Sequence, residues 1–227
     1  MDSTPQTIPI WDLPTRLFHW LMVALFALAW ITGEMGLGWL HARCGEFMLG
    51  VLLFRLIWGF VGGETARFHN FIKGPREVLR YLQSLLSRDA APQASVGHNP
   101  VGGVMVLALM IGSLMTIALG LFARDDDDPL FFGALAHLVP YTFAEMVAEI
   151  HEGVVGLMLV LVGLHVAANL FYLIVLRENL IQPMVTGSMP LREAPPITPP
   201  KMGSIWRAVL VASLVGSGLY FGLQSMR

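Results

Sequence analysis

Four histidines lie in or beside long apolar stretches of the 227-residue chain, where they could hold a metal-containing cofactor. Two of them, His151 and His165, are fourteen residues apart in one stretch. At 100° per residue both rings leave the same face of a helix, about 21 Å apart along its axis. A bilayer's hydrocarbon core is about 30 Å thick, so this face offers one imidazole near each membrane surface.

Each of these imidazoles needs a partner at its own depth in the membrane. His19 opens the first apolar stretch, and His41 lies just before the second. Because successive spans alternate in direction, depth pairs His19 with His165 and His41 with His151. Two such pairs on facing helices are what two bis-histidine haem b groups require. Attachment would be non-covalent, since the chain lacks a C-x-x-C-H motif.

Other interpretations of the histidines remain open. A single histidine inside a membrane can be a hydrogen-bonded packing residue, although ionisable groups there usually have a function. A zinc or di-iron site would need closely spaced ligands such as H-E-x-x-H, and "HEGVV" at 151–155 lacks the second histidine. Matched depth across four histidines favours haem over either alternative.

Composition predicts the elements that must position these residues. The chain is 55% hydrophobic and only 13% charged, which is typical of a membrane protein. A span needs about 20 mostly apolar residues. Five stretches qualify, at about 17–39, 45–61, 101–122, 143–176 and 205–223. We therefore predict an all-α membrane protein, a four-helix transmembrane haem-binding bundle plus a fifth C-terminal transmembrane helix.

The same pattern predicts the domain organisation and the orientation. Residues 1–187 would form the di-haem domain, 188–204 a Pro-rich linker and 205–227 the last helix. The loops at 62–100 and 177–204 carry most of the basic residues, so the positive-inside rule makes them cytoplasmic. We expect a multi-pass protein of the bacterial inner membrane, with its N-terminus cytoplasmic and its C-terminus periplasmic. Residues 75–89 predict an amphipathic helix in the membrane interface.

Four sequence motifs resemble the bacterial cytochrome b561 family, which includes the cytochrome b subunits of nickel–iron hydrogenases. They are "IWDLPTRLFHW" (10–20), "FRLIWGFVGGETARFHNFIKGP" (54–75), "GHNPVGG" (97–103) and "LHVAANL" (164–170). The resemblance covers about residues 8 to 187 and leaves the fifth span unexplained. It implies that histidines of spans one, two and four hold two b haems. By position these are His19, His41, His151 and His165.

Four further residues are candidates for cofactor or quinone contacts. Arg55 lies inside a span, about 21 Å from His41, where its guanidinium could bind a haem propionate; snorkelling to the surface is the alternative. Arg16, three residues before His19, could serve the same haem. The resemblance to a formate dehydrogenase subunit puts quinone beside the cytoplasmic haem, which suggests His98 and Asn99. A turn leading into the next span would also explain that pair.

The predicted function is electron transfer between the quinone pool and a periplasmic redox partner. The chain would be a subunit of an oxidoreductase, and we expect no catalytic residue in the chain itself. The partner would be a c-type cytochrome or a hydrogenase-like oxidoreductase, alongside membrane lipid. Glu149 or Glu152, together with Asp125–Asp128, would attract a basic partner, or these acids simply form a solvated surface. A net charge of −2 without a basic run gives no support for nucleic acid. The alternatives are a stand-alone quinone reductase with a small donor such as superoxide, and a non-redox membrane anchor subunit.

Overall fold

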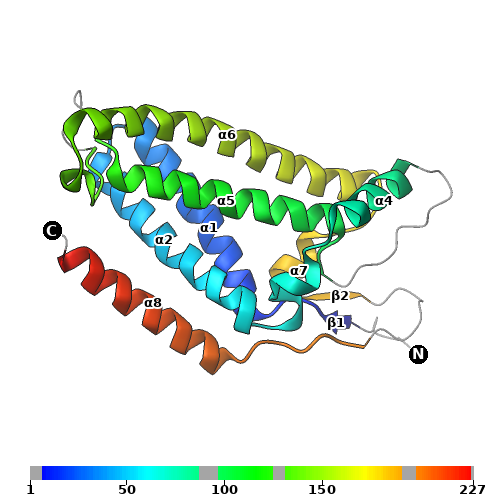
Figure 1. Ribbon diagram of the computed structural model, residues 1–227. Coiled ribbons are helices and arrows are strands. Elements are labelled where there is room, and N and C mark those ends of the chain that lie inside the picture. The colour runs from blue at the N-terminus through cyan, green and yellow to red at the C-terminus, as the bar shows by residue number, and fades with distance from the viewer. Residues whose placement is uncertain (1–6, 87–96, 125–130, 191–197, 226–227) are drawn as a thin grey trace. The chain divides into compact units, whose positions relative to one another are not determined.

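Five long apolar helices make up most of the chain (Figure 1). The computed structural model describes residues 7–86, 97–124, 131–190 and 198–225. The long helices are α1 (Leu13–Glu34), α2 (Gly38–Val61), α5 (Pro100–Phe122), α6 (Tyr141–Ile174) and α8 (Ile205–Ser225). Each is long and apolar enough to cross a bilayer. The predicted all-α fold with five candidate membrane helices is confirmed.

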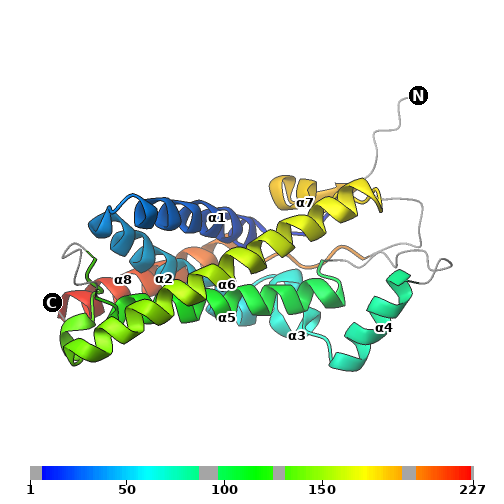
Figure 2. The ribbon, with the colours of Figure 1, turned by 90° about the horizontal axis from the view of Figure 1, so that it is seen from above.

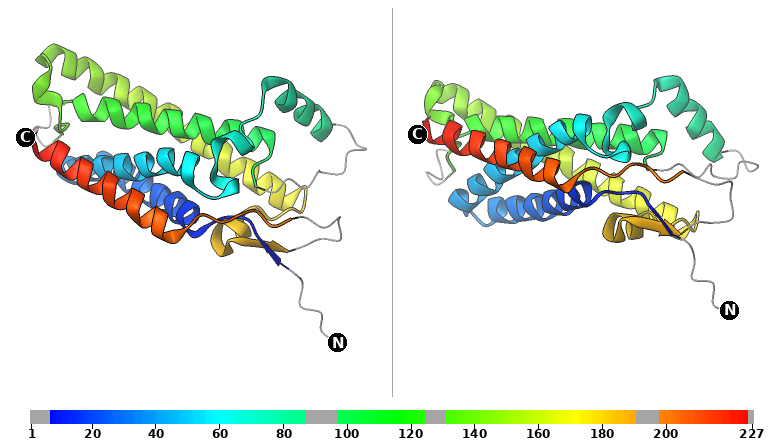
Figure 3. Two further views of the ribbon diagram at one scale, coloured as in Figure 1. Left: turned by 60° about the horizontal axis from the view of Figure 1, so that its bottom comes forward. Right: turned by 90° about the horizontal axis from the view of Figure 1, so that it is seen from below.

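Short elements connect the long helices. They are the strands β1 (Thr7–Pro9) and β2 (Ser188–Pro190), the helices α3 (Phe68–Phe71), α4 (Pro75–Leu86) and α7 (Ile181–Thr186), and the 3₁₀ turns η1 (Glu64–Ala66) and η2 (Ala136–Leu138). The two strands lie side by side (Figure 3). They pair antiparallel, with Ile8 opposite Met189. Residues 188–190 of the expected linker thus form a strand, and residues 191–197 lie outside the described part of the chain.

The chain divides into two compact units whose boundary crosses every long helix. Unit 1 comprises Met1–Arg16, Ile57–Leu107 and His165–Ala208, and unit 2 comprises Leu17–Leu56, Ala108–Leu164 and Val209–Arg227. Unit 1 therefore contains the start of α1, the end of α2, the start of α5, the end of α6 and the start of α8. In a chain whose helices cross a membrane in turn, these five ends belong to one membrane face.

A buried aspartate organises unit 1. Asp12 is only 4% exposed, and its carboxylate accepts four hydrogen bonds. The donors are the backbone N–H of Thr15 at 2.9 Å, the indole Nε1 of Trp58 at 3.2 Å, and the backbone N–H groups of Gly63 at 3.2 Å and Gly203 at 3.3 Å. The first of these caps the N-terminus of α1. Asp12 thereby joins the start of α1 to the end of α2 and to the segment that precedes α8.

Further contacts in unit 1 fix the start of the fifth long helix. The backbone N–H of Glu64 donates to the carbonyl of Lys201 at 2.9 Å, and the N–H of Lys201 donates to the Glu64 carboxylate at 2.9 Å. Arg207, in the first turn of α8, donates to the carbonyl of Val61 at the end of α2 at 2.7 Å. A methyl group at Gly203 would overlap the Trp58 indole. The segment before α8 is therefore held closely against the end of α2.

The turn between α1 and α2 corrects the expected position of His41. Gly36 has a φ of 68°, and its N–H bonds to the carbonyl of Gly33 at 3.1 Å. The N–H of Leu37 bonds to the carbonyl of Thr32 at 2.9 Å, which completes a Schellman motif. α1 therefore ends at Glu34, and α2 begins at Gly38 rather than near residue 45. His41 lies in the first turn of α2 and not before it.

Candidate functional site

Unit 2 brings His41 of α2 and His151 of α6 together. Their ring centroids are 6.0 Å apart, and the ring planes are nearly perpendicular at 86°. Both rings are partly buried. The early start of α2 produces this arrangement, because it puts His41 on a helix whose backbone fixes the direction of the side chain. These are the two histidines that were predicted to pair from their depth in the membrane.

Each of the two rings is anchored through Nδ1 to a backbone carbonyl of another helix. His41 Nδ1 lies 2.8 Å from the carbonyl oxygen of Ala29 in α1, and His151 Nδ1 lies 2.9 Å from that of Thr116 in α5. A carbonyl oxygen can only accept, so each Nδ1 carries the proton and donates it. A neutral ring protonated on Nδ1 keeps a lone pair on Nε2, which is how histidines that bind metals are usually held.

Two glycines allow these rings to lie against the neighbouring helices. A methyl group at Gly33 of α1 would lie 3.3 Å from His41 Nδ1. One at Gly120 of α5 would lie 3.0 Å from His151 Cε1 and 3.3 Å from its Nδ1. These separations are shorter than ordinary van der Waals contact. The absence of a side chain at both positions therefore lets each ring reach its carbonyl.

The loop between α5 and α6 adds an aromatic contact to the pair. The Phe131 ring lies 5.6 Å from the His41 ring. The N–H of Gly133 donates to the carbonyl of Ala123 at 2.9 Å, and that of Leu135 donates to the carbonyl of Leu121 at 2.8 Å. These bonds hold the loop on the C-terminal end of α5. In the same unit a cavity of about 380 Å³ is lined by Arg43, Glu46, Phe132, Ala134 and His137.

The other predicted pair, His19 and His165, is divided between the two units. In unit 2 the His19 ring lies edge-on to Trp20, with centroids 5.0 Å apart. In unit 1 the Asn169 amide lies 3.4 Å from His165 Nε2 and donates to the His165 carbonyl at 2.8 Å. Because the two histidines belong to different units, their pairing stays a prediction.

The two candidate arginines have different surroundings. Arg55 in α2 is only 2% exposed, and its guanidinium carbon lies 5.8 Å from the centroid of the Phe18 ring. This burial is not what snorkelling to the surface would give. Arg16 donates from Nη1 to the carbonyl of Val185 at 2.6 Å, next to the C-cap Gly187 of α7. Arg16 therefore holds the end of α7, with further N–H groups left on its guanidinium.

The two candidate quinone residues also differ. The Asn99 side-chain oxygen accepts a hydrogen bond from the N–H of Gly102 at 2.7 Å, and Pro100 opens α5. This is an N-cap followed by a proline at the first helical position. Asn99 Nδ2 also donates to the Tyr172 hydroxyl at 2.9 Å. Asn99 therefore caps the start of α5, which agrees with the alternative explanation of this residue as part of a turn leading into the span.

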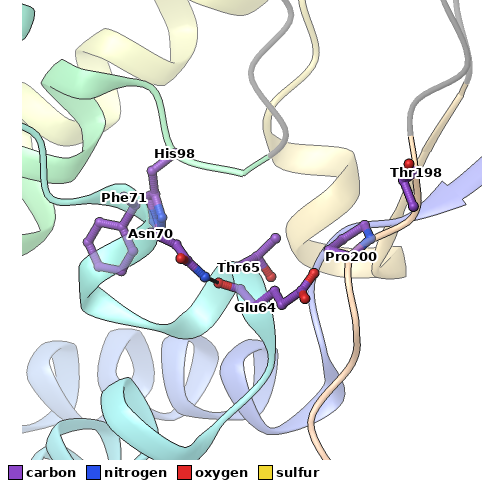
Figure 4. A pocket seen from close by; sticks show the side chains of 7 residues that line it. All are labelled: Glu64, Thr65, Asn70, Phe71, His98, Thr198 and Pro200. Carbon is purple, nitrogen blue, oxygen red and sulfur yellow. Dashed lines mark hydrogen bonds between the residues drawn. The ribbon is translucent and has the colours of Figure 1, made fainter.

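His98 instead lies between aromatic rings at the edge of a cavity. Its ring centroid is 4.5 Å from that of Phe71 and 4.7 Å from that of Trp11. The cavity measures about 250 Å³ and is lined by Glu64, Thr65, Asn70, Phe71, His98, Thr198 and Pro200 (Figure 4). Sequence reasoning missed Glu64 and Asn70, although both lie in the "GGETARFHN" part of a motif singled out above.

Among the described residues, no group of three or more histidine, cysteine, aspartate or glutamate side chains could hold a metal ion. In this part of the chain, the candidate metal ligands that lie together are the two histidines His41 and His151. The acidic run Asp125–Asp128 lies outside the described residues. Of the acids near the start of α6, Glu145 accepts a hydrogen bond from the Tyr141 hydroxyl at 3.2 Å.

The five apolar helices indicate a multi-pass helical membrane protein, and two of these helices bring the His41 and His151 rings together. A model of the family described as prokaryotic cytochrome b561 matches residues 10–187. The chain belongs to this family. Membership makes it a b-type membrane cytochrome, a class of proteins that bind haem b and transfer electrons.

Several curated relatives are similar to the chain at low identity. A probable Ni/Fe-hydrogenase 1 B-type cytochrome subunit of Escherichia coli (strain K12) is 25% identical over 138 residues, which cover 49% of this chain and 57% of the relative. A probable Ni/Fe-hydrogenase B-type cytochrome subunit of Bradyrhizobium diazoefficiens is 21% identical, covering 82% and 87%. One of Rhizobium leguminosarum bv. viciae is 24% identical, covering 80% and 88%. The chain thus spans little more than half of the E. coli relative. No solved structure matches the chain.

Proposed function

We propose that the chain is a di-haem cytochrome b that passes electrons between the quinone pool and a partner oxidoreductase across the bacterial inner membrane. The observation that carries the proposal is the pair of rings at His41 and His151. Both are anchored through Nδ1, and their centroids are 6.0 Å apart. Two imidazoles on opposite sides of one metal, at metal–nitrogen distances of ~2 Å, have ring centres ~6 Å apart. The separation of the two rings therefore supports a bis-histidine haem at this pair.

A second haem would be held by His19 and His165. The family resemblance and the fourteen-residue spacing on α6 support this pair. Arg55 and Arg16 are the proposed partners of haem propionates, and the burial of the Arg55 guanidinium supports its role. Bound haem supplies one-electron transfer. Two histidine ligands per iron leave no open coordination position, so these residues suit electron transfer better than oxygen binding.

The proposed orientation puts the N-terminus in the cytoplasm and the C-terminus in the periplasm. His41 and His151 would then hold the periplasmic haem, within reach of a partner outside the membrane. The relatives named as hydrogenase cytochrome subunits support a hydrogenase-like oxidoreductase as that partner. A periplasmic c-type cytochrome is the other proposed partner. In this orientation Phe131, whose ring contacts that of His41, would lie on the same side as the partner.

Quinone is proposed to bind on the opposite, cytoplasmic side. The cavity beside His98 offers an imidazole and the Glu64 carboxylate, two groups able to exchange protons with a quinol (Figure 4). Asn99 would support this site indirectly, because its side chain caps α5 directly after His98.

A stand-alone quinone reductase with a small anionic donor is the second candidate. The cavity of about 380 Å³ that Arg43 lines is the observation in its favour. However, Arg43 forms a salt bridge of 2.7 Å with Glu46, which offsets the positive charge that would attract superoxide. This favours a protein partner over a small anion. The anchored histidine rings likewise disfavour a membrane anchor without a redox centre.

The proposal is tested with purified protein reconstituted into liposomes. A reduced-minus-oxidised spectrum should show the α-band of b haem, and added quinol should reduce both haems. In His151→Ala, quinol should still reduce the remaining haem, while electron transfer to an added periplasmic acceptor should stop. A colourless preparation of intact protein would contradict the proposal. Copurification with an oxidoreductase, rather than activity with superoxide, distinguishes the subunit from the stand-alone enzyme.

A further inference from the structure

The amphipathic helix α4 is covered on only part of its apolar face. Val78 and Tyr81 are partly buried in unit 1. Leu79 and Leu82, on the adjoining part of the same face, are 59% and 41% exposed. At 100° per residue, these two leucines lie about 60° apart and form one continuous edge. Within the described residues, α4 thus has a packed apolar edge and an exposed one.

A chain of polar contacts fixes the packed edge. The hydroxyl groups of Tyr81 and Tyr172 are 2.8 Å apart, and Asn99 donates to the Tyr172 hydroxyl at 2.9 Å. Burial and the bond with Tyr172 raise the pKa of Tyr81, so its hydroxyl stays protonated at physiological pH. The contacts attach α4 near the end of α6 and the start of α5, and Figure 2 shows α4 running at an angle to the first turns of α5. α4 therefore lies at the level where these spans leave the membrane.

Three cations flank the exposed edge. Arg76 and Arg80 follow one another at i and i+4 and lie on the polar face next to Leu79, and Lys73 precedes the helix by two residues. The salt bridge found among the described residues is Arg43–Glu46, so these three cations have no acidic partner there. The one acid of α4, Glu77, lies on the far side of the polar face.

We infer that Lys73, Arg76 and Arg80 bind the headgroups of anionic phospholipids, while Leu79 and Leu82 enter the acyl region beneath them. The chemistry is complementary: exposed leucines need an apolar environment, and unpaired cations beside them need an anionic one. Guanidinium groups are also well matched to phosphate oxygens, to which they donate two parallel hydrogen bonds. α4 would then be a lipid-binding helix, tied to the bundle through Tyr81, that distinguishes anionic from zwitterionic membranes.

The test is amide hydrogen exchange of α4 in the full-length protein. The protein is placed in nanodiscs of phosphatidylcholine alone and of phosphatidylcholine mixed with phosphatidylglycerol. Each cation near an anionic surface contributes about fivefold to binding, so exchange should slow by up to ~100-fold in the mixed bilayer. The ratio of exchange rates between the two bilayers is the quantity compared, because unfolding of a variant would speed exchange in both.

Two variants provide the contrast. K73Q/R76Q/R80Q removes the charges and should bring the ratio close to one. R76K/R80K keeps the charges and should retain most of the slowing. High salt should reduce the wild-type ratio, since surface charge interactions are screened. Equal exchange of the wild-type helix in both bilayers would overturn the inference and would indicate that a protein surface covers the leucines. A ratio unchanged in the triple glutamine variant would also overturn it.

Discussion

Gly120→Ala tests whether the position of the His151 ring matters for the cofactor. The new methyl group would lie 3.0 Å from His151 Cε1, whereas ordinary contact begins at 3.4 Å, so the ring must move by about 0.4 Å. Its bond to the Thr116 carbonyl is 2.9 Å long. A shift of that size along the bond would stretch it to about 3.3 Å, just beyond the upper limit of about 3.2 Å for an N–H···O hydrogen bond. Overpacking of this kind costs about 1–3 kcal/mol.

The matched control is Gly153→Ala, two residues beyond His151 in α6. A methyl group there meets nothing within 4 Å apart from its chain neighbours and the adjoining backbone of its own helix. Replacing a helical glycine by alanine at an open position stabilises by up to about 1 kcal/mol. The two alanine variants are therefore expected to change stability in opposite directions. Only Gly120→Ala should also disturb a haem.

The assay is a redox titration followed in the b-haem α-band, together with denaturant-induced loss of the Soret band in detergent. Gly120→Ala should shift or partly remove one of two redox components and lower the denaturation midpoint. Gly153→Ala should leave both components unchanged. If the Gly120→Ala protein matched the control in both measurements, the close packing at His151 would have no part in holding a cofactor.

Three further predictions concern the polar groups that position the helices. Asp12→Ala removes the acceptor of four hydrogen bonds and should lower the free energy of unfolding by about 2–4 kcal/mol, measured by denaturation in detergent, while an unchanged midpoint would refute its organising role. Arg55→Gln should lower the midpoint potential of one haem by tens of millivolts, because a nearby cation favours the reduced form; a shift of the potential upward would contradict this. Tyr81→Phe should cost about 1 kcal/mol below pH ~10, where the raised pKa keeps the hydroxyl protonated, and the difference from wild type should decline only above that pH. A difference already lost at neutral pH would show that the protonated hydroxyl is not what stabilises α4.

Helical periodicity and depth were enough to predict the five long helices and the proximity of His41 and His151. The fourteen-residue spacing of His151 and His165 needs only the geometry of one helix, and counting apolar residues gives five spans. His41 was expected before its helix because three glycines between residues 33 and 38 resembled the softened end of a single span. The structure instead uses Gly36 to end one helix, and the next begins two residues later.

Other features of the site depend on backbone atoms and could not be predicted from side-chain identity. Every residue has a carbonyl, so nothing in the sequence indicates that those of Ala29 and Thr116 accept the imidazole protons. The hydrogen bonds to the Asp12 carboxylate join segments up to 191 residues apart, and no local sequence pattern indicates that these segments meet. The strands β1 and β2 are three residues long and contain prolines, so they are too short to show an alternating pattern.

The central claim is that His41 and His151 clamp one of two haems, and haem content per chain tests it most directly. The pyridine haemochrome absorbance of purified protein is measured against protein concentration for wild type, His151→Ala and His165→Ala. The account predicts two haems in wild type and one in each variant, with different α-bands remaining. If His151→Ala retained the full wild-type haem content, the assignment of this histidine as a ligand would be wrong.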